Sequence, residues 1–232
     1  MISTKRVLLL FGLVCAFHLK AQITPGVYLA HSDKVTYELK LNNSYLILST
    51  YEESPAKFLK TLGGFYSLSD GKIAVDLEFN SNYKADGIKT LDIPYTAKKK
   101  KLVLQLETKM VFIKVKAMGQ DLDGAWLFAT RGPDTGQDRR GDKNARKTLK
   151  FLKDGRFQWI AYNVDDMKFF GTGGGSFMSQ DGNYVEHIEY FSRDNSRVGA
   201  SLKFDYEVQG NDWHHKGLNS KGEPMYEIWS IR

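Results

Sequence analysis

Residues 61–81, TLGGFYSLSDGKIAVDLEFNS, have a second copy at residues 172–192, TGGGSFMSQDGNYVEHIEYFS. The offset between the copies is 111 residues (172 minus 61), and it also relates Asp70 to Asp181. The identical positions include a Gly-Gly pair, an Asp-Gly pair, a glutamate and the final serine. A recurrence of this length indicates two homologous structural units. We place them at residues 22–118 and 121–232.

The match continues upstream of these segments. Residues 37–48 correspond to residues 149–160 at an offset of 112 (149 minus 37). Gly26-Val-Tyr28 corresponds to Gly124-Ala-Trp126 at an offset of 98 (124 minus 26). The change of offset predicts an insertion in the second unit between its first two strands.

Both units have the pattern of antiparallel strands joined by tight turns. Apolar residues alternate at Ile73, Val75, Leu77 and Phe79, which places them on one face of a strand. Turn signals separate such runs, because Asp-Gly and Asn-Asn pairs tolerate the backbone of two-residue hairpins; they occur at residues 42–43, 70–71, 154–155 and 181–182. Only the stretch 54–62 could form a short helix.

About eight short strands in each unit predict an all-β fold. Strands joined hairpin to hairpin favour two tandem antiparallel barrels, since closure removes the exposed sheet edge. The alternative is one larger two-sheet sandwich to which each repeat contributes a sheet.

The first 21 residues have the layout of a secretory signal peptide. Lys5 and Arg6 precede an apolar run from Val7 to Phe17, and Ala21 is a small residue at the expected cleavage point. A membrane anchor would need about 20 apolar residues. A lipoprotein would use Cys15, but Val14 precedes it where a small residue is preferred. We therefore expect a secreted or periplasmic protein whose mature chain has no stable membrane span.

Cleavage changes the composition in two ways. The full chain has 33 basic and 27 acidic residues, a net charge of +6, and residues 1–21 remove three of the basic residues and no acidic one. The mature charge is then +3, which does not suggest a nucleic-acid partner. The lone cysteine leaves with the signal peptide, so disulfides, thiol catalysis and cysteine metal ligands are excluded from the mature chain.

The second unit resembles the lipocalin-like (calycin) barrels of secreted bacterial proteins. It opens with Gly124-Ala125-Trp126 and ends with YEIWSIR at residues 226–232. In lipocalins the tryptophan of a G-x-W motif packs against an arginine of the last strand, which implies that Arg232 stacks on Trp126. The first unit shares the resemblance only through the repeat, because Tyr28 replaces the tryptophan. The resemblance implies an exported protein that binds a small, largely apolar ligand.

The inserted segment in the second unit, residues 131–147, carries six basic and three acidic residues. In lipocalin-like barrels this connection lies beside the open end. We interpret it as a mobile cationic lid, with Arg139 and Arg140 attracting an anionic head group. The alternative is a solvated loop whose aspartates balance its arginines.

Aromatic and ionisable residues of the second unit are the remaining ligand-binding candidates. Four aromatic residues could line an apolar cavity: Trp159, Tyr162, Phe177 and Tyr190. His187 and Glu189 share a strand face by period two, so the carboxylate could orient the imidazole as a base. A carboxylate is also present at the equivalent position 78, which favours a structural role for Glu189.

Other motifs favour structure over chemistry. The glycine pairs, Gly63-Gly64 and Gly174-Gly175, recur in both repeats and indicate places where a strand bends or bulges. His214 and His215 are adjacent on a strand and so point to opposite faces, which argues against a shared metal. We expect no metal, no cofactor and no catalytic residue. The alternatives are a structural or surface-interaction protein with filled barrels, or a barrel enzyme using His187 and Glu189; the oligomeric state stays open.

Overall fold

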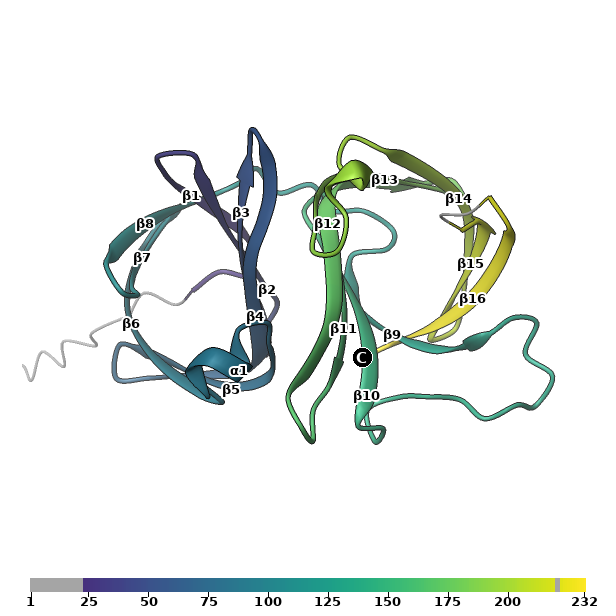
Figure 1. The fold of residues 1–232 in the computed structure, drawn as a ribbon, viewed down its shortest axis with the longest axis horizontal. Coiled ribbons are helices and arrows are strands. Elements are labelled where there is room, and N and C mark those ends of the chain that lie inside the picture. Colours follow the sequence, from purple (N-terminus) through teal and green to yellow (C-terminus); the bar gives the residue numbers. More distant parts are fainter. Residues whose placement is uncertain (1–22, 220–221) are drawn as a thin grey trace, which may run out of the picture.

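The computed structural model describes residues 23–219 and 222–232. It contains two closed eight-stranded antiparallel barrels that lie side by side, so the predicted fold class is confirmed and the single sandwich is excluded (Figure 1). The expected signal peptide lies outside the described residues.

Each barrel follows the up-and-down order, every strand pairing with the next in sequence. The first barrel contains β1 (Gly26–Ser32), β2 (Val35–Leu41), β3 (Tyr45–Glu53), β4 (Ala56–Ser69), β5 (Lys72–Asn80), β6 (Thr90–Lys98), β7 (Lys101–Gln105) and β8 (Lys109–Lys114). The second contains β9 (Gly124–Arg131), β10 (Arg146–Lys153), β11 (Arg156–Asn163), β12 (Lys168–Gln180), β13 (Asn183–Phe191), β14 (Ser201–Gln209), β15 (Asp212–Leu218) and β16 (Pro224–Ile231).

The strand positions extend the repeat well beyond the quoted stretch. β3, β5 and β6 begin 111 residues before β11, β13 and β14 (for example, 183 minus 72). The short helix α1 (Tyr83–Asp86) follows β5 as the 3₁₀ turn Asn195–Arg197 follows β13. The expectation of a helix at residues 54–62 is wrong, because β4 begins at Ala56.

The three Asp-Gly pairs at residues 70–71, 154–155 and 181–182 form the expected tight turns. Asp70, Asp154 and Asp181 have φ near +50° and the following glycines have φ near +75°. The Asn42 turn is built differently. Its side-chain oxygen accepts the N–H groups of Ser44 and Tyr45, at 3.0 and 2.7 Å.

A β-bulge occurs at each glycine pair and turns a glutamate out of the ladder. Gly63 and Gly64 pair with Phe79 and Leu77, so Glu78 between them has no partner opposite. Gly174 and Gly175 leave Glu189 unpaired in the same way. The bulge shifts the inward–outward alternation by one residue. In β13, Ile188 faces the barrel interior, whereas Tyr190 faces the other barrel.

The barrels contact each other through equivalent strands, β3 to β5 of the first and β11 to β13 of the second. Tyr51 stacks on Tyr190, with ring centroids 4.5 Å apart. Phe79 packs on Tyr162 at 5.1 Å. Tyr162 and Tyr190 are the residues 111 positions after Tyr51 and Phe79, so the interface has the pseudo-two-fold arrangement of a symmetric dimer.

A buried polar network lies within this pseudo-two-fold interface and joins the two barrels. At its centre Gln158 donates to Thr61 and Thr172, both at 3.0 Å, and accepts from Ser49 at 2.8 Å. Thr61 and Thr172 are themselves equivalent residues in the repeat. The Gln158 amide therefore donates hydrogen bonds to equivalent threonines of both barrels.

Arg156 is the main cation of the interface. It binds Glu189 through two nitrogens, at 2.6 and 2.7 Å, and reaches across to Glu38 at 2.7 Å. Glu38 is fully buried and also contacts Lys40 and Tyr51. Burial alone would raise the pKa of Glu38, but Arg156 and Lys40 outweigh it and lower this pKa to about 2.

The expected stacking of Arg232 on Trp126 is wrong. The Arg232 guanidinium lies over Phe65 and Tyr45 of the first barrel, 4.5 and 5.0 Å from their ring centroids, and binds both oxygens of Glu78 at 2.7 Å. The bulge at Glu78 presents its carboxylate to this arginine. The last described residue thus links the barrels.

Trp126 instead helps to close one end of the second barrel. Its indole N–H donates to the Leu122 carbonyl at 2.9 Å, and Leu122 is buried against the barrel core. Tyr28 makes the equivalent bond to the Thr24 carbonyl at 2.7 Å in the first barrel. In each barrel the carbonyl two residues before the first strand therefore accepts a hydrogen bond from an aromatic side chain of that strand.

The two bulges predict sensitivity to a single added methyl group. A Cβ at position 64 would lie 1.9 Å from the Asp76 carbonyl oxygen, and one at position 175 would lie 2.1 Å from the His187 oxygen. We expect Gly64→Ala and Gly175→Ala each to lower the free energy of unfolding by about 1–3 kcal/mol. Gly119→Ala, which meets open space, is the control. Equal midpoints of denaturant unfolding in all three variants would contradict the bulge geometry.

Loss of Arg156 leaves buried Glu38 without its partner from the other barrel. We expect Arg156→Met to cost about 3–5 kcal/mol of unfolding free energy, as for other broken buried ion pairs. Arg197→Met removes a half-exposed arginine 3.9 Å from Asp194 and should cost less than about 1 kcal/mol. Chemical denaturation measures both. Similar losses in the two variants would rule out a special role for the interface arginine.

Candidate functional site

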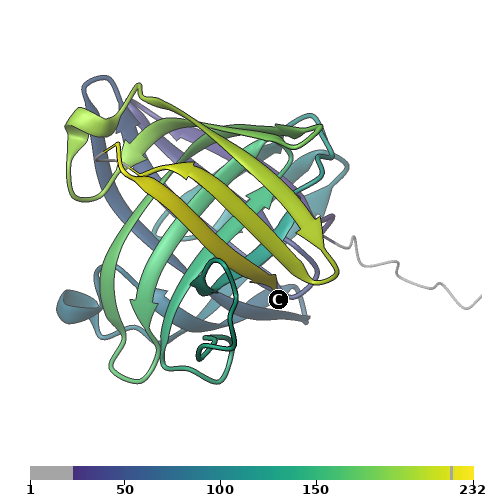
Figure 2. The same ribbon diagram turned by 90° about the vertical axis from the view of Figure 1, so that its right-hand side faces the viewer.

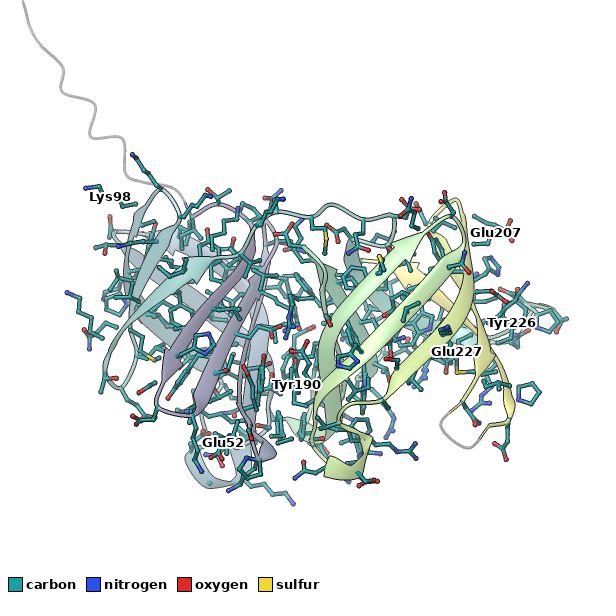
Figure 3. All side chains as sticks on the ribbon, turned by 90° about the horizontal axis from the view of Figure 1, so that it is seen from above. Glu52, Lys98, Tyr190, Glu207, Tyr226 and Glu227 are labelled. Carbon is teal, nitrogen blue, oxygen red and sulfur yellow. The ribbon has the colours of Figure 1, made fainter. Side chains whose placement is uncertain are left out.

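The predicted ligand-binding residues lie in four different environments. Tyr162, Tyr190 and Glu189 belong to the interface between the barrels; Tyr190 is labelled there in Figure 3. Tyr162 donates to Glu78 at 2.7 Å, and burial together with that carboxylate raises its pKa. These side chains are engaged with the other barrel.

Trp159 and Phe177 lie inside the second barrel. Trp159 packs on Phe191 and Phe177 on Tyr184, with centroid distances of 5.4 and 6.0 Å. Both belong to an aromatic core. They contribute to the filling of the barrel.

His187 is exposed on the outer wall and lies 3.1 Å from the Ser201 hydroxyl. Glu189 is displaced by the bulge and binds Arg156. The two side chains therefore do not meet in the barrel interior. The catalytic arrangement considered for them requires that they do, and the structure contradicts it.

Figure 2 shows the course of the inserted loop between β9 and β10. Side-chain contacts hold this loop against the second barrel. Arg139 binds Asp134, Asp212 and the Ser230 hydroxyl, at 3.0, 2.6 and 2.8 Å. Asp142 binds Arg232 at 2.8 Å. Arg139 thus points to the outer wall and is neutralised by two carboxylates.

Arg140, its neighbour, has a different environment. Its backbone N–H donates to the Ala129 carbonyl at 2.8 Å, where a register shift between β9 and β16 frees that oxygen. Its guanidinium lies 4.4 Å from the Phe128 ring centroid. Within the described residues Arg140 has no ion-pair partner. Burial and the nearby Arg146 lower its pKa.

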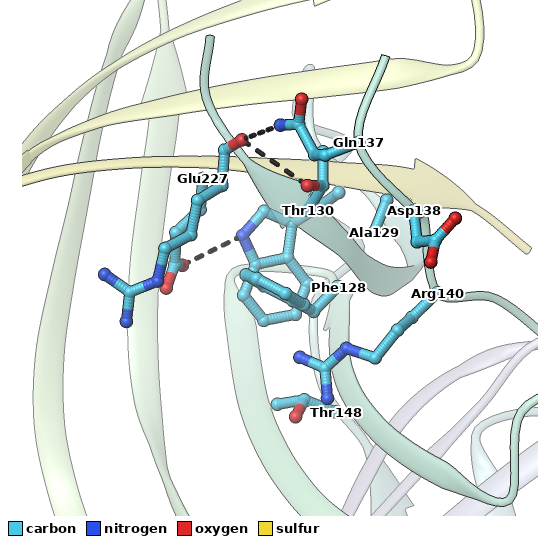
Figure 4. A pocket seen from close by; sticks show the side chains of 10 residues that line it. Phe128, Ala129, Thr130, Gln137, Asp138, Arg140, Thr148 and Glu227 are labelled. Atoms are coloured by element: carbon cyan, nitrogen blue, oxygen red, sulfur yellow. Dashed lines mark hydrogen bonds between the residues drawn. The ribbon is translucent and has the colours of Figure 1, made fainter. Parts of the chain in front are cut away.

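A pocket of about 540 Å³ lies between this loop and the barrel (Figure 4). β9 and β10 pair only through residues 124–127 and 149–152, and beyond them the two strands separate. The lining residues are Phe128, Ala129, Thr130, Arg131, Gln137, Asp138, Arg140, Thr148, Glu227 and Trp229. Gln137 closes one side by donating to the Arg131 carbonyl at 2.6 Å.

The floor of the pocket connects with a polar cluster inside the aromatic core. Trp229 donates to Glu227 at 3.1 Å. Deeper in the barrel, Lys150 binds Glu186 at 2.7 Å, and Tyr184 donates to the same carboxylate. The Lys150 ammonium lies 5.1 to 5.3 Å from three aromatic rings: Trp213, Trp229 and Tyr184. A charged pair is thus enclosed by aromatic faces.

His215 is the least satisfied member of this interior. It is 1% exposed, both ring nitrogens lack hydrogen-bond partners, and its Nδ1 is 3.7 Å from Glu227. Burial, helped by Lys150, lowers the pKa of His215 to about 4. Burial alone would raise the pKa of Glu227, but His215 and Lys150 outweigh it and lower this pKa. The imidazole is therefore neutral and the carboxylate charged at neutral pH.

Sequence reasoning missed most of the pocket and interior residues. A usable signal was present in β13, where Glu186 shares an inward face with Tyr184 and Ile188. An ionisable residue at such a position implies a buried partner. The partner, Lys150, is on another hairpin, and periodicity does not indicate which lysine meets which glutamate.

His214 and His215 do point to opposite faces. His214 lies 2.8 Å from the Tyr226 hydroxyl on the partly exposed side, while His215 is inside. Among residues 23–219 and 222–232, no group of three or more His, Cys, Asp or Glu side chains could hold a metal ion. No helix in the same part of the chain is long and apolar enough to cross a membrane.

No protein-family model matches the chain, and no curated protein matches it at a significant level. The two closed barrels are consistent with a lipocalin-like fold.

The lowered pKa of His215 predicts an acid-sensitive stability. The unfolded chain binds this proton near pH 6.5 and the folded protein only near pH 4, so the contribution is complete above pH 6.5 and declines as the pH falls toward 4. We expect a slope of about 1.4 kcal/mol per pH unit across this window. Denaturant unfolding between pH 4.5 and 6.5 measures it.

His215→Gln should flatten this pH dependence, and the exposed His187→Gln provides the control. A slope that is unchanged by His215→Gln would assign the acid sensitivity to other groups.

Proposed function

We propose that the protein is an exported, non-enzymatic, lipocalin-like binding protein for a small amphipathic ligand. The ligand occupies the pocket between the inserted loop and the second barrel, and its anionic head group contacts Arg140. The observation that carries the proposal is an arginine in an aromatic pocket without an ion-pair partner among the described residues. Export rests on the expected signal peptide, and lipocalin-like identity on the motifs and the barrel topology.

The volume and lining of the pocket agree with this ligand class. A volume of about 540 Å³ falls in the range typical of small-molecule sites. Phe128 and Trp229 offer apolar surface, while Thr148 and Gln137 offer hydrogen bonds. The deeper interior is filled by Trp213, Tyr184 and Phe204, so the ligand lies at the barrel end.

Acidic residues in the pocket restrict the head group. Glu227 is charged and oriented by Trp229, and Asp138 lies in the loop. Two carboxylates disfavour a highly charged anion such as a phosphate monoester. A single carboxylate or sulfonate beside Arg140, with its chain over Phe128, suits the pocket best.

Binding of decanoate and its neutral analogue decanol tests the proposal. Each compound displaces the fluorescent probe 1-anilinonaphthalene-8-sulfonate from the purified protein, and the displacement gives its affinity. We expect decanoate to bind more tightly than decanol. Arg140→Gln should lower the affinity for decanoate at least about tenfold, because it removes one charge-assisted hydrogen bond. Decanol affinity should hardly change.

Arg197→Gln is the matched control, because it removes the same charge outside the pocket. Phe128→Ala should weaken both compounds. Equal affinities for decanoate and decanol, or equal effects of the two arginine variants, would contradict a head-group site at Arg140.

A further inference from the structure

The densest positive charge of the chain lies on the first barrel. Residues 98–116 contain seven lysines and one acidic residue, Glu107, a net charge of +6 that equals the formal charge of the whole chain. Four of these lysines are consecutive, from Lys98 to Lys101. The inserted loop, residues 131–147, carries only half of this excess.

The fold gathers these lysines on one surface. Lys98 and Lys101 face each other across the β6–β7 hairpin, and the Lys114 N–H donates to the Lys100 carbonyl at 2.8 Å. Strands β6, β7 and β8 lie on the side of the first barrel away from the second barrel (Figure 1). Figure 3 shows Lys98 at this outer edge. The surface is therefore not covered by the other barrel.

Exposed aliphatic side chains lie among the lysines. Val111 and Ile113 on β8 are 48% and 46% exposed. Val111 is opposite Val103 in the ladder and Ile113 is opposite Lys101. We name this surface the lysine face: the lysines at positions 98–101 and 109, with Val103, Val111 and Ile113.

Little negative charge opposes the lysine face. Glu107, in the β7–β8 turn, lies 3.6 Å from Lys60. Asp92 is on β6, but near the opposite end of that strand from Lys98. The side chains that define the face are all cationic or aliphatic.

We propose that the lysine face binds the surface of a bilayer that contains anionic phospholipids. Each lysine near such a surface strengthens binding about fivefold, and the two exposed aliphatic residues can enter the head-group region. A single-stranded nucleic acid would be expected to stack on aromatic rings. The only aromatic side chain of the neighbouring β6, Tyr95, packs against the barrel core. The membrane is the partner that uses both the charge and the aliphatic residues.

Co-sedimentation with lipid vesicles tests the inference. The purified protein is mixed with vesicles of phosphatidylcholine alone, or of phosphatidylcholine with phosphatidylglycerol at a ratio of about 7:3, a composition with a strong negative surface potential. We expect binding to the anionic vesicles only, and weaker binding at high salt. A variant with Lys98, Lys99, Lys100 and Lys101 all changed to Gln should partition at least about tenfold less.

A matched variant removes four exposed lysines from the second barrel and its loop: Lys143, Lys168, Lys203 and Lys216, each changed to Gln. It has the same net charge as the first variant and should bind anionic vesicles like the unaltered protein. Val111→Ser with Ile113→Ser tests the aliphatic contribution and should reduce the binding that survives high salt.

Three outcomes would overturn the inference. They are equal binding to both kinds of vesicle, equal losses in the two lysine variants, or an affinity for heparin or double-stranded DNA that matches that for anionic vesicles at the same salt concentration. The ligand pocket is on the second barrel, so decanoate binding is expected to be unchanged in the variant at Lys98–Lys101 and in the variant at Val111 and Ile113, both on the first barrel.

Discussion

The bidentate contact of Arg156 with Glu189, extended to buried Glu38, is the interaction on which the arrangement of the two barrels depends. A carboxylate without access to water is stable only beside a cation with correct geometry. Arg156 belongs to the second barrel and Glu38 to the first. Separation of the barrels would leave this charge in an apolar surface that includes Ile47 and Phe79. The barrels are therefore one structural unit, although each closes its own sheet.

The bulges explain why one glutamate is present in both repeats. A glycine pair on one strand allows the facing strand to gain one residue, and the side chain of that extra residue turns outward. Glu78 and Glu189 use this position in the same way, as acceptors for Arg232 and Arg156. The arginines are not equivalent in the repeat, so the two halves have kept the acceptor and replaced the donor. The aromatic pairs of the interface therefore obey the pseudo-two-fold symmetry, whereas the arginines that bind the two glutamates do not.

Much of the fold followed from the sequence because its signals are local. Asp-Gly turns, alternating apolar residues and an offset of 111 residues define strands and repeats without any long-range information. The sequence does not predict which face of the sheet the residues after Glu189 occupy. The bulge reverses the inward–outward alternation there, and the hydrophobic pattern does not reveal the bulge. The sequence pattern therefore predicts that Tyr190 lines the cavity, whereas in the structure it packs on Tyr51 of the other barrel.

The candidate site was predictable only in part. Arg140 could be chosen because the insertion is visible as a change of offset, but Arg139 looks the same in sequence and is neutralised by Asp212 and Asp134. Glu227, Trp229 and Lys150 are separated by long stretches of chain and meet only through barrel closure. Their pairing depends on register and strand order.

The pseudo-two-fold interface has a consequence for assembly. Each barrel presents a surface complementary to the other barrel, and residues 115–123 form the covalent connection between them. During folding, a first barrel can meet the second barrel of another molecule with the same contacts it makes within the chain. Concentrated refolding thus favours exchanged dimers, and the short linker is what gives the intramolecular partner its kinetic advantage.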